Sequence, residues 1–363
     1  MEENIKQIKN PPAKTGRIEY IDILRVISML CIVMIHVVSQ SFEKIPVTGY
    51  EWSTLNVYDS ISRWSVPIFV MISGALFLGS NKPLKVIFHK NISRLITSFV
   101  FWSLVYATIE YIRFRKAKSA ATQAIAGHYH MWFVIMIIGL YLIVPILRKI
   151  VESKELTKLF LVLALIFTAV IPTINTVLGF LSFEPVTTLK GIFTSIVADF
   201  NMRLPLGYAG YFVLGYTLNK YDISKKLEYI IYALGTAGLI FTIASTFFIS
   251  IKLDKAYTGF YTYTTPNVAA MAVAVFVLFK KHYHIKNADS VLQKLIRALS
   301  KYSFGVYLVH LAVIEFIKLN LNITSVTFNP IIATPIICIS TALISILISA
   351  VLNHIPVLNK YIV

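Results

Sequence analysis

The chain has 363 residues, of which 57% are hydrophobic and only 14% are Asp, Glu, Lys or Arg, against about 25% charged residues in an ordinary soluble domain. Together with a mean hydropathy of +0.72, this composition excludes a soluble globular protein, a disordered chain and a nucleic-acid-binding domain. The net charge of +17 is interpreted as a topology signal, because Lys and Arg collect in the cytoplasmic loops of membrane proteins.

About ten apolar runs follow a basic N-terminal tail, and each approaches the roughly 20 residues that a membrane-spanning helix needs. They cover residues 21–38, 57–79, 91–112, 131–150, 157–175, 204–219, 227–250, 266–280, 302–318 and 331–352. The sixth and eighth runs are short and interrupted by Gly or Pro. The sequence predicts an all-α polytopic membrane helix bundle in which residues 1–17 form a cytoplasmic tail and residues 18–363 form a single transmembrane domain.

The distribution of basic residues predicts the orientation. With the N-terminus in the cytoplasm, twenty-two of the 34 Lys and Arg residues fall in cytoplasmic segments and ten in outer segments. This bias predicts that both termini are cytoplasmic. The basic cluster at 113–118 is the exception among the outer segments. Either it neighbours a negatively charged surface or substrate, or the third helix ends elsewhere.

Three ionisable residues lie in the first apolar run, where a charge costs at least about 2.5–3.5 kcal/mol. Asp22 and Arg25 are three residues apart and can pair. Arg25 and His36 are eleven apart, which returns to the same helix face after three turns. Arg25, near the cytoplasm, can hold phosphates of a nucleotide-like donor, and His36, deeper in the membrane, can take a proton from an acceptor hydroxyl. In the alternative, Arg25 reaches lipid headgroups and His36 bonds a neighbouring helix.

The second and third runs also begin with charged residues. Asp59 and Arg63 are four apart at the start of the second run and can form an ion pair. Lys90 and Arg94 have the same spacing at the cytoplasmic end of the third run. The alternative interpretation is that these cations are ordinary anchors at the membrane interface.

Histidines with aromatic neighbours lie in the fourth and ninth runs. His130 precedes Trp132 at the outer surface, and Tyr307 and His310 share one helix face. The alternatives are an aromatic belt at the membrane interface and a histidine with a structural hydrogen bond. His128 and His130 make a weak metal site without a nearby carboxylate or thiol, so we expect no metal.

Taken together, four of these segments resemble acyltransferase family 3, a family of membrane-bound acyl transferases. In chain order they read RIEYIDILRVISMLCIVMIH, SRWSVPIFVMISGALF, YHMWFVIMIIGLYLIVPIL and SFGVYLVH. The resemblance covers nearly the whole chain and is strongest to the short, stand-alone O-acetyltransferases of the enterobacterial common antigen type. It implies a multi-pass protein of the bacterial plasma membrane.

The resemblance implies transfer of an acyl group, usually acetyl, from cytoplasmic acyl-coenzyme A to a hydroxyl of a cell-surface glycan or lipid-linked saccharide. His36 would be the catalytic base, Arg25 would bind the donor or place His36, and Asp22 would orient Arg25. Acyl-coenzyme A is a co-substrate, and no permanently bound cofactor is implied.

The donor site departs from the family at one position. Many members carry two arginines three residues apart at the start of the third helix, and here the matching positions are Asn91 and Arg94. We expect Arg94, helped by Lys90, to contact the donor phosphates. The acceptor would approach from the outer side, near residues that the later motifs supply: Arg63, His130, Trp132, Tyr307 and His310.

The rival hypothesis is a secondary transporter or flippase for a lipid-linked sugar or small anion, which would use the same buried charges. Many transporters consist of paired inverted halves with matching broken helices, and the sequence shows neither. The identity of the acceptor, the choice between acetyl and succinyl, the choice between direct transfer and an acyl-enzyme relay, and the oligomeric state are left open by the sequence.

Overall fold

The computed structural model describes residues 17–180, 186–199, 206–283 and 290–362. Within these ranges the chain folds into helices and contains no β-strand, which confirms the all-α prediction. Nine helical segments in the described part of the chain are long and apolar enough to cross a membrane. The predicted tail, apart from Arg17, lies outside the described residues.

The difference between nine segments and the expected ten comes from the sixth run. It forms α13 (Ala209–Lys220), which has 12 residues. At 1.5 Å per residue, α13 is about 18 Å long, against a hydrocarbon core of about 30 Å. The described part of this run is therefore shorter than a membrane-spanning helix.

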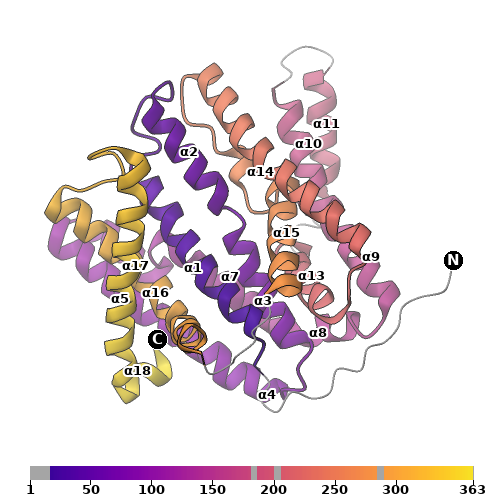
Figure 1. Cartoon of the computed structure of the whole chain (residues 1–363), viewed down its shortest axis with the longest axis horizontal. Helices are drawn as coiled ribbons and strands as arrows, with labels where there is room; N and C mark the ends of the chain where they lie inside the picture. Colours follow the sequence, from indigo (N-terminus) through magenta and orange to yellow (C-terminus); the bar gives the residue numbers. More distant parts are fainter. Residues whose placement is uncertain (1–16, 181–185, 200–205, 284–289, 363) are drawn as a thin grey trace.

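Helix α1 crosses the middle of the molecule (Figure 1). It packs against helices from both halves of the chain, which are α2 (Tyr50–Ser62), α3 (Ser65–Leu78), α15 (Pro266–His282), α16 (Val291–Leu321) and α17 (Pro330–His354). α1 itself runs from Glu19 to Ser39. Its polar residues are thus placed in the interior of the bundle.

The second predicted span is one segment with a break in it. α2 ends at Ser62 and α3 begins at Ser65, so Arg63 and Trp64 lie between the two helices. Pro67 has no N–H to donate to the carbonyl of Arg63, four residues earlier, and this weakens the helix at that point. The break places Arg63 inside the bundle.

The outer helices form hairpins around this centre. α5 (Ser93–Phe114) follows a π-helical turn, η1 (Ile87–Ile92), and turns into α6 (Ala117–Ala126). The basic cluster at 113–118 therefore spans the turn of this hairpin, and the third run ends close to its predicted boundary. The remaining outer helices are α7 (Trp132–Leu142), α8 (Val144–Ile150), α9 (Lys154–Leu165), η3 (Ile166–Val170), α10 (Ile171–Leu178), α11 (Val186–Asp199) and α14 (Lys225–Leu253).

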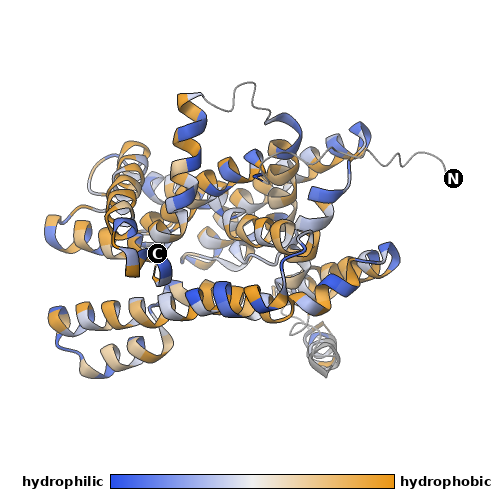
Figure 2. Cartoon of the chain, turned by 90° about the horizontal axis from the view of Figure 1, so that it is seen from below, coloured by the Kyte–Doolittle hydropathy of each residue, from blue (hydrophilic) through white to orange (hydrophobic). Residues whose placement is uncertain are grey.

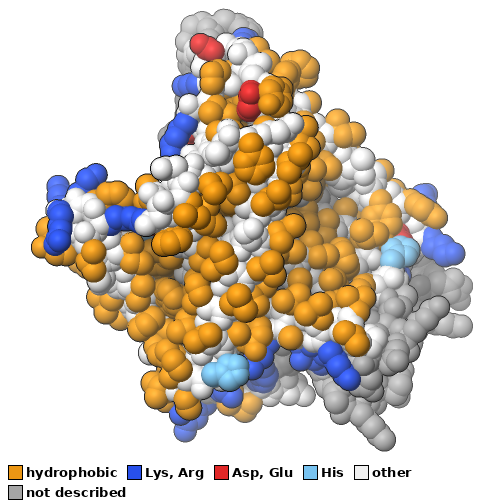
Figure 3. All heavy atoms as spheres, turned by 60° about the vertical axis from the view of Figure 1, so that its left-hand side comes forward, with side chains coloured by type: hydrophobic (Ala, Val, Ile, Leu, Met, Phe, Trp, Pro, Cys, Tyr) orange, Lys and Arg blue, Asp and Glu red, His pale blue; other side chains and the backbone are white. Residues whose placement is uncertain are grey.

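Besides a buried apolar core, the helices also expose many apolar side chains, as expected for a protein in lipid. On α17 the fully buried side chains include Thr334, Thr341, Ser345 and Ser349, whereas isoleucines and leucines of the same helix are exposed. Figure 2 shows hydrophobic residues along the helices and hydrophilic residues gathered near their ends. Figure 3 shows a broad hydrophobic face bordered by Lys and Arg side chains at its lower edge and upper left corner.

The beginning of α1 and the end of α17 lie on the same, lower side of the molecule in Figure 1. The short C-terminal helix α18 (Pro356–Tyr361) returns from there to the start of α5, where the carbonyl of Tyr361 accepts a hydrogen bond from Thr97. The assignment of this side to the cytoplasm stays a prediction.

Two glycines allow α3 and α13 to cross in close contact. A Cβ atom on Gly215 would lie 2.0 Å from the carbonyl oxygen of Met71, and one on Gly74 would lie 1.7 Å from that of Phe212. Glycines at such crossings let the helix backbones touch. The broken helix that carries Arg63 is anchored by this contact.

We expect Gly215→Ala to destabilise the protein by about 1–3 kcal/mol, because the added methyl group must push two helix backbones apart. The measurement is the midpoint of thermal unfolding in detergent. Gly139→Ala is the matched control, since a Cβ atom there has no neighbour within 4 Å. Equal midpoints for the two variants would show that the crossing tolerates a side chain.

Candidate functional site

Three imidazole rings from distant parts of the sequence meet inside the bundle. The ring centroids of His36 and His310 are 5.1 Å apart, those of His130 and His310 are 5.3 Å apart, and those of His36 and His130 are 6.4 Å apart. His36 lies in the last turn of α1, His310 in the middle of α16 and His130 in the 3₁₀ turn η2 (Tyr129–Met131). We call these three residues the histidine cluster.

Backbone contacts hold the cluster in place. The hydroxyl of Tyr307 donates to the carbonyl of His130 over 2.6 Å, which ties η2 to α16. Nδ1 of His310 lies 3.1 Å from the carbonyl of Val306. Since a carbonyl only accepts, Nδ1 carries the hydrogen of His310 and Nε2 is left as an acceptor.

Two nitrogens of the cluster are buried without a partner. Nε2 of His130 and Nε2 of His310 make no hydrogen bond within the described part of the chain. The two residues are 2% and 0% exposed, and an unsatisfied buried polar group costs about 1–3 kcal/mol. Both nitrogens belong to rings that border on His36, which is only half-buried. The cluster can therefore hold a polar group next to His36.

His128 connects the histidine cluster to Glu315. Nδ1 of His128 lies 3.0 Å from Nδ1 of His130, and Nε2 of His128 lies 3.4 Å from a carboxylate oxygen of Glu315. The ring of Tyr106 stacks on His128 with centroids 4.5 Å apart. Sequence analysis did not assign His128 or Glu315 to the site. Titratable side chains close to apolar runs were the available signal, but it did not show that the two residues are neighbours.

Arg63 and Trp132, two predicted acceptor-side residues, each contact a tyrosine of the segment 261–263. Arg63 forms the predicted ion pair with Asp59, and its guanidinium lies 4.3 Å from the ring centroid of Tyr261. Trp132 is 40% exposed and stacks on the ring of Tyr263, 6.0 Å away. The two rings form a partly exposed aromatic surface.

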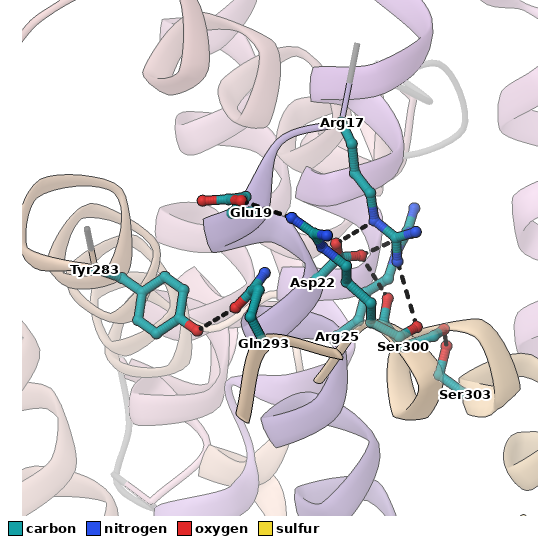
Figure 4. Close-up of polar contacts among 9 residues, drawn as sticks. Arg17, Glu19, Asp22, Arg25, Tyr283, Gln293, Ser300 and Ser303 are labelled. Atoms are coloured by element: carbon teal, nitrogen blue, oxygen red, sulfur yellow. Dashed lines mark hydrogen bonds and ion pairs between the residues drawn. The ribbon is translucent and has the colours of Figure 1, made fainter. Parts of the chain in front are cut away.

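The other end of α1 carries a cluster of charges around Asp22 (Figure 4). Asp22 accepts a hydrogen bond of 2.6 Å from Nε of Arg17 and one of 2.7 Å from the hydroxyl of Ser300. The predicted partner Arg25 is farther away, with 4.0 Å between its nitrogen and the carboxylate oxygen. Arg17, which the sequence placed in the tail, is thus the closest cation to Asp22. Arg25 keeps donors for another anion.

Lys90 and Arg94 lie on different helical elements from Arg25. Lys90 is an exposed residue of η1, and Arg94 lies one turn later with its guanidinium 5.7 Å from the ring centroid of Phe304. Phe304 stacks in parallel on Tyr307, and Tyr307 contacts His130. A chain of aromatic contacts therefore leads from Arg94 to the histidine cluster.

The comparisons with known proteins agree with this arrangement. A family model described as an acyltransferase domain, that of acyltransferase family 3, matches residues 18–350. No curated protein and no solved structure matches the chain. The match extends from α1 into α17 and includes every helix that contributes to the site. The chain therefore belongs to acyltransferase family 3 and is a membrane acyltransferase.

Proposed function

We propose that the protein moves an acyl group, acetyl in the first instance, from cytoplasmic acyl-coenzyme A to a hydroxyl of a cell-surface glycan or lipid-linked saccharide. The proposal rests on one observation: α1 carries one group of polar residues near each of its ends. Arg25 and Asp22 lie near its start, and His36 joins the histidine cluster in its last turn. Eleven residues correspond to about 16 Å of helix. In the proposal, the donor phosphates lie at Arg25 and the reacting thioester lies at His36, so this length of helix separates them.

In this proposal His36 is the general base. It takes the proton from the acceptor hydroxyl, and the oxygen forms a bond to the thioester carbonyl carbon. The carbon–sulfur bond breaks, and the departing thiolate of coenzyme A receives the proton from His36. The products are the acyl ester and free coenzyme A. Nε2 of His130 and Nε2 of His310 have no partner among the described residues. In the proposal, Nε2 of His310 accepts a hydrogen bond from a water that bridges to the acceptor beside His36, and His130 borders the same space.

Cations on the side of Arg25 bind the donor. Arg25 is 32% exposed at its side chain, and a guanidinium matches the geometry of a phosphate. Arg94, with Lys90 beside it, supplies further positive charge at the position of the family's arginine pair. The acceptor lies against Trp132 and Arg63. We place the protein in the plasma membrane of a bacterium, with this donor side facing the cytoplasm.

Purified protein in nanodiscs tests the proposal. We would supply radiolabelled acetyl-coenzyme A with and without a surface-glycan extract and measure released coenzyme A and label in the glycan. The transferase produces both. A transporter or flippase would move a substrate across the membrane without releasing coenzyme A, so absence of both products with acetyl- and succinyl-coenzyme A favours the rival.

We expect Arg25→Gln to raise KM for acetyl-coenzyme A by about 10–100-fold, because a hydrogen bond to a charged group contributes about 1.5–3 kcal/mol. The turnover number should change less than KM. Arg113→Gln is the control, since Arg113 bonds Asn320 at the end of another helix. An unchanged KM in the Arg25 variant would remove Arg25 from the donor site.

A further inference from the structure

A groove lies along α13. It runs between α9 with η3 on one side and the ends of α14 and α15 on the other, at the right of Figure 1. Its volume is about 1550 Å³, against about 300–1000 Å³ for most small-molecule pockets. None of the residues that line it belongs to the proposed catalytic or donor groups.

The middle of the groove is apolar. Leu161, Val162 and Leu165 of α9 face Leu214 of α13 and Ala269 of α15 across it. α9 and α10 are mostly exposed helices, so the groove lies at the lipid-facing side of the bundle. In a bilayer, apolar walls at this position are in contact with hydrocarbon rather than water.

The length of α13, which forms the base of the groove, is close to the hydrocarbon thickness of one leaflet. The helix is about 18 Å long at 1.5 Å per residue. Half of the hydrocarbon core of a bilayer is about 15 Å thick. The acyl chains of one lipid molecule, lying along α13, match this depth.

One end of the groove is positively charged. Lys154, Lys158 and Lys220 line it there, and both α9 and α14 begin at this end. Lys154 lies 5.7 Å from the ring centroid of Tyr221, and Nζ of Lys220 donates to the hydroxyl of Tyr216 over 2.8 Å. These contacts hold two of the cations at the mouth of the groove.

The two acidic residues that line this end each have a lysine partner. Glu152 pairs with Lys149 over 2.9 Å, and Asp222 lies 3.6 Å from Lys280. Lys280 also donates to two backbone carbonyls. The positive ends of two helix dipoles add to the remaining lysines. The mouth is therefore complementary to an anionic headgroup, and the walls behind it are complementary to acyl chains.

We propose that this groove binds a glycerophospholipid with an anionic headgroup, with its phosphate at Lys154, Lys158 and Lys220 and its acyl chains along α13. The site is separate from acyl transfer and does not depend on the proposed function. A lipid in the groove bridges α9 to α13 and α15. It thereby stabilises the attachment of α9, which contacts the rest of the bundle chiefly through α13 and α8.

Lipid binding to the delipidated full-length protein tests the site. Native mass spectrometry would measure the binding of dioleoyl phosphatidylglycerol and of dioleoyl phosphatidylcholine, with thermal unfolding as a second readout. We expect the wild type to prefer phosphatidylglycerol, and the double variant Lys154→Gln/Lys158→Gln to bind it about 10-fold more weakly, as expected for two lysines near a headgroup. The control Lys294→Gln/Lys301→Gln, exposed on α16, should keep the preference.

One further variant and two competing ligands test whether the acyl chains and the groove itself are needed for binding. Leu161→Trp narrows the groove and should weaken both lipids, while its unfolding midpoint without lipid shows that it is folded. Equal affinity for the two lipids, or an unchanged preference in the double lysine variant, overturns the proposal. So does displacement of phosphatidylglycerol by acetyl-coenzyme A, which would make the groove part of the donor site, or by glycerol 3-phosphate, which would show that the chains play no part.

Discussion

His36→Ala should lower the rate of acyl transfer by about 10²–10⁴-fold, which is the usual contribution of a positioned general base. His36 is the half-buried member of a cluster whose other two histidines are buried, so it is the imidazole that an entering substrate reaches. The measurement is the release of coenzyme A from acetyl-coenzyme A in the presence of acceptor. Binding of acetyl-coenzyme A should persist, because Arg25 lies about 16 Å away along α1, and Lys90 and Arg94 lie on η1 and α5.

His354→Ala is the matched control for this variant. His354 is an exposed residue at the end of α17, and its ring contacts only the carbonyl of Ala350 within the described residues. It should retain wild-type turnover. If His36→Ala remains folded by its unfolding midpoint and transfers acetyl at the wild-type rate, the assignment of His36 as the base is wrong.

Asp59→Ala should destabilise the protein by about 3–5 kcal/mol, because it leaves the guanidinium of Arg63 buried without its counter-ion. Asp59 is 1% exposed, and the side chain of Arg63 is 15% exposed. One oxygen of Asp59 and Nε of Arg63 already lack partners among the described residues. The measurement is the unfolding midpoint in detergent, converted with the enthalpy of unfolding.

The double variant Asp59→Ala/Arg63→Met should recover most of this stability, since replacing a buried ion pair by apolar groups is often neutral or stabilising. It should not recover transfer if Arg63 contacts the acceptor as proposed. Recovery of both stability and activity would restrict Arg63 to a structural role. A single variant Asp59→Ala with the wild-type midpoint would contradict the importance of the pair for folding.

The sequence was sufficient for the features that depend on local composition. Apolar runs of spanning length predict helices in lipid, because the backbone has to satisfy its own hydrogen bonds there. The pairs Asp22–Arg25 and Asp59–Arg63 followed from helical spacing, and both are present, the first at a limiting distance. The order of four motifs pointed to the family that the family model identifies.

Local patterns were less accurate where a helix is interrupted or short. The second run was predicted as one span, and Tyr50–Leu78 is one spanning segment. The pattern did not show that its helix breaks at Arg63, where Pro67 follows four residues later. The sixth run was counted as a span although it is short and interrupted, and its described helix α13 has 12 residues. Hydropathy reports how apolar a run is, but not where its backbone hydrogen bonds stop.

Only the tertiary structure decided which polar residues meet. His36, His130 and His310 lie on α1, η2 and α16, and no spacing within one helix relates them. The contact of His128 with Glu315, and of Arg17 with Asp22, likewise depends on how separate segments pack. Helix periodicity determines the face of each side chain. Which faces oppose each other is determined by close crossings such as that of Gly215 on Met71, which bring distant segments together.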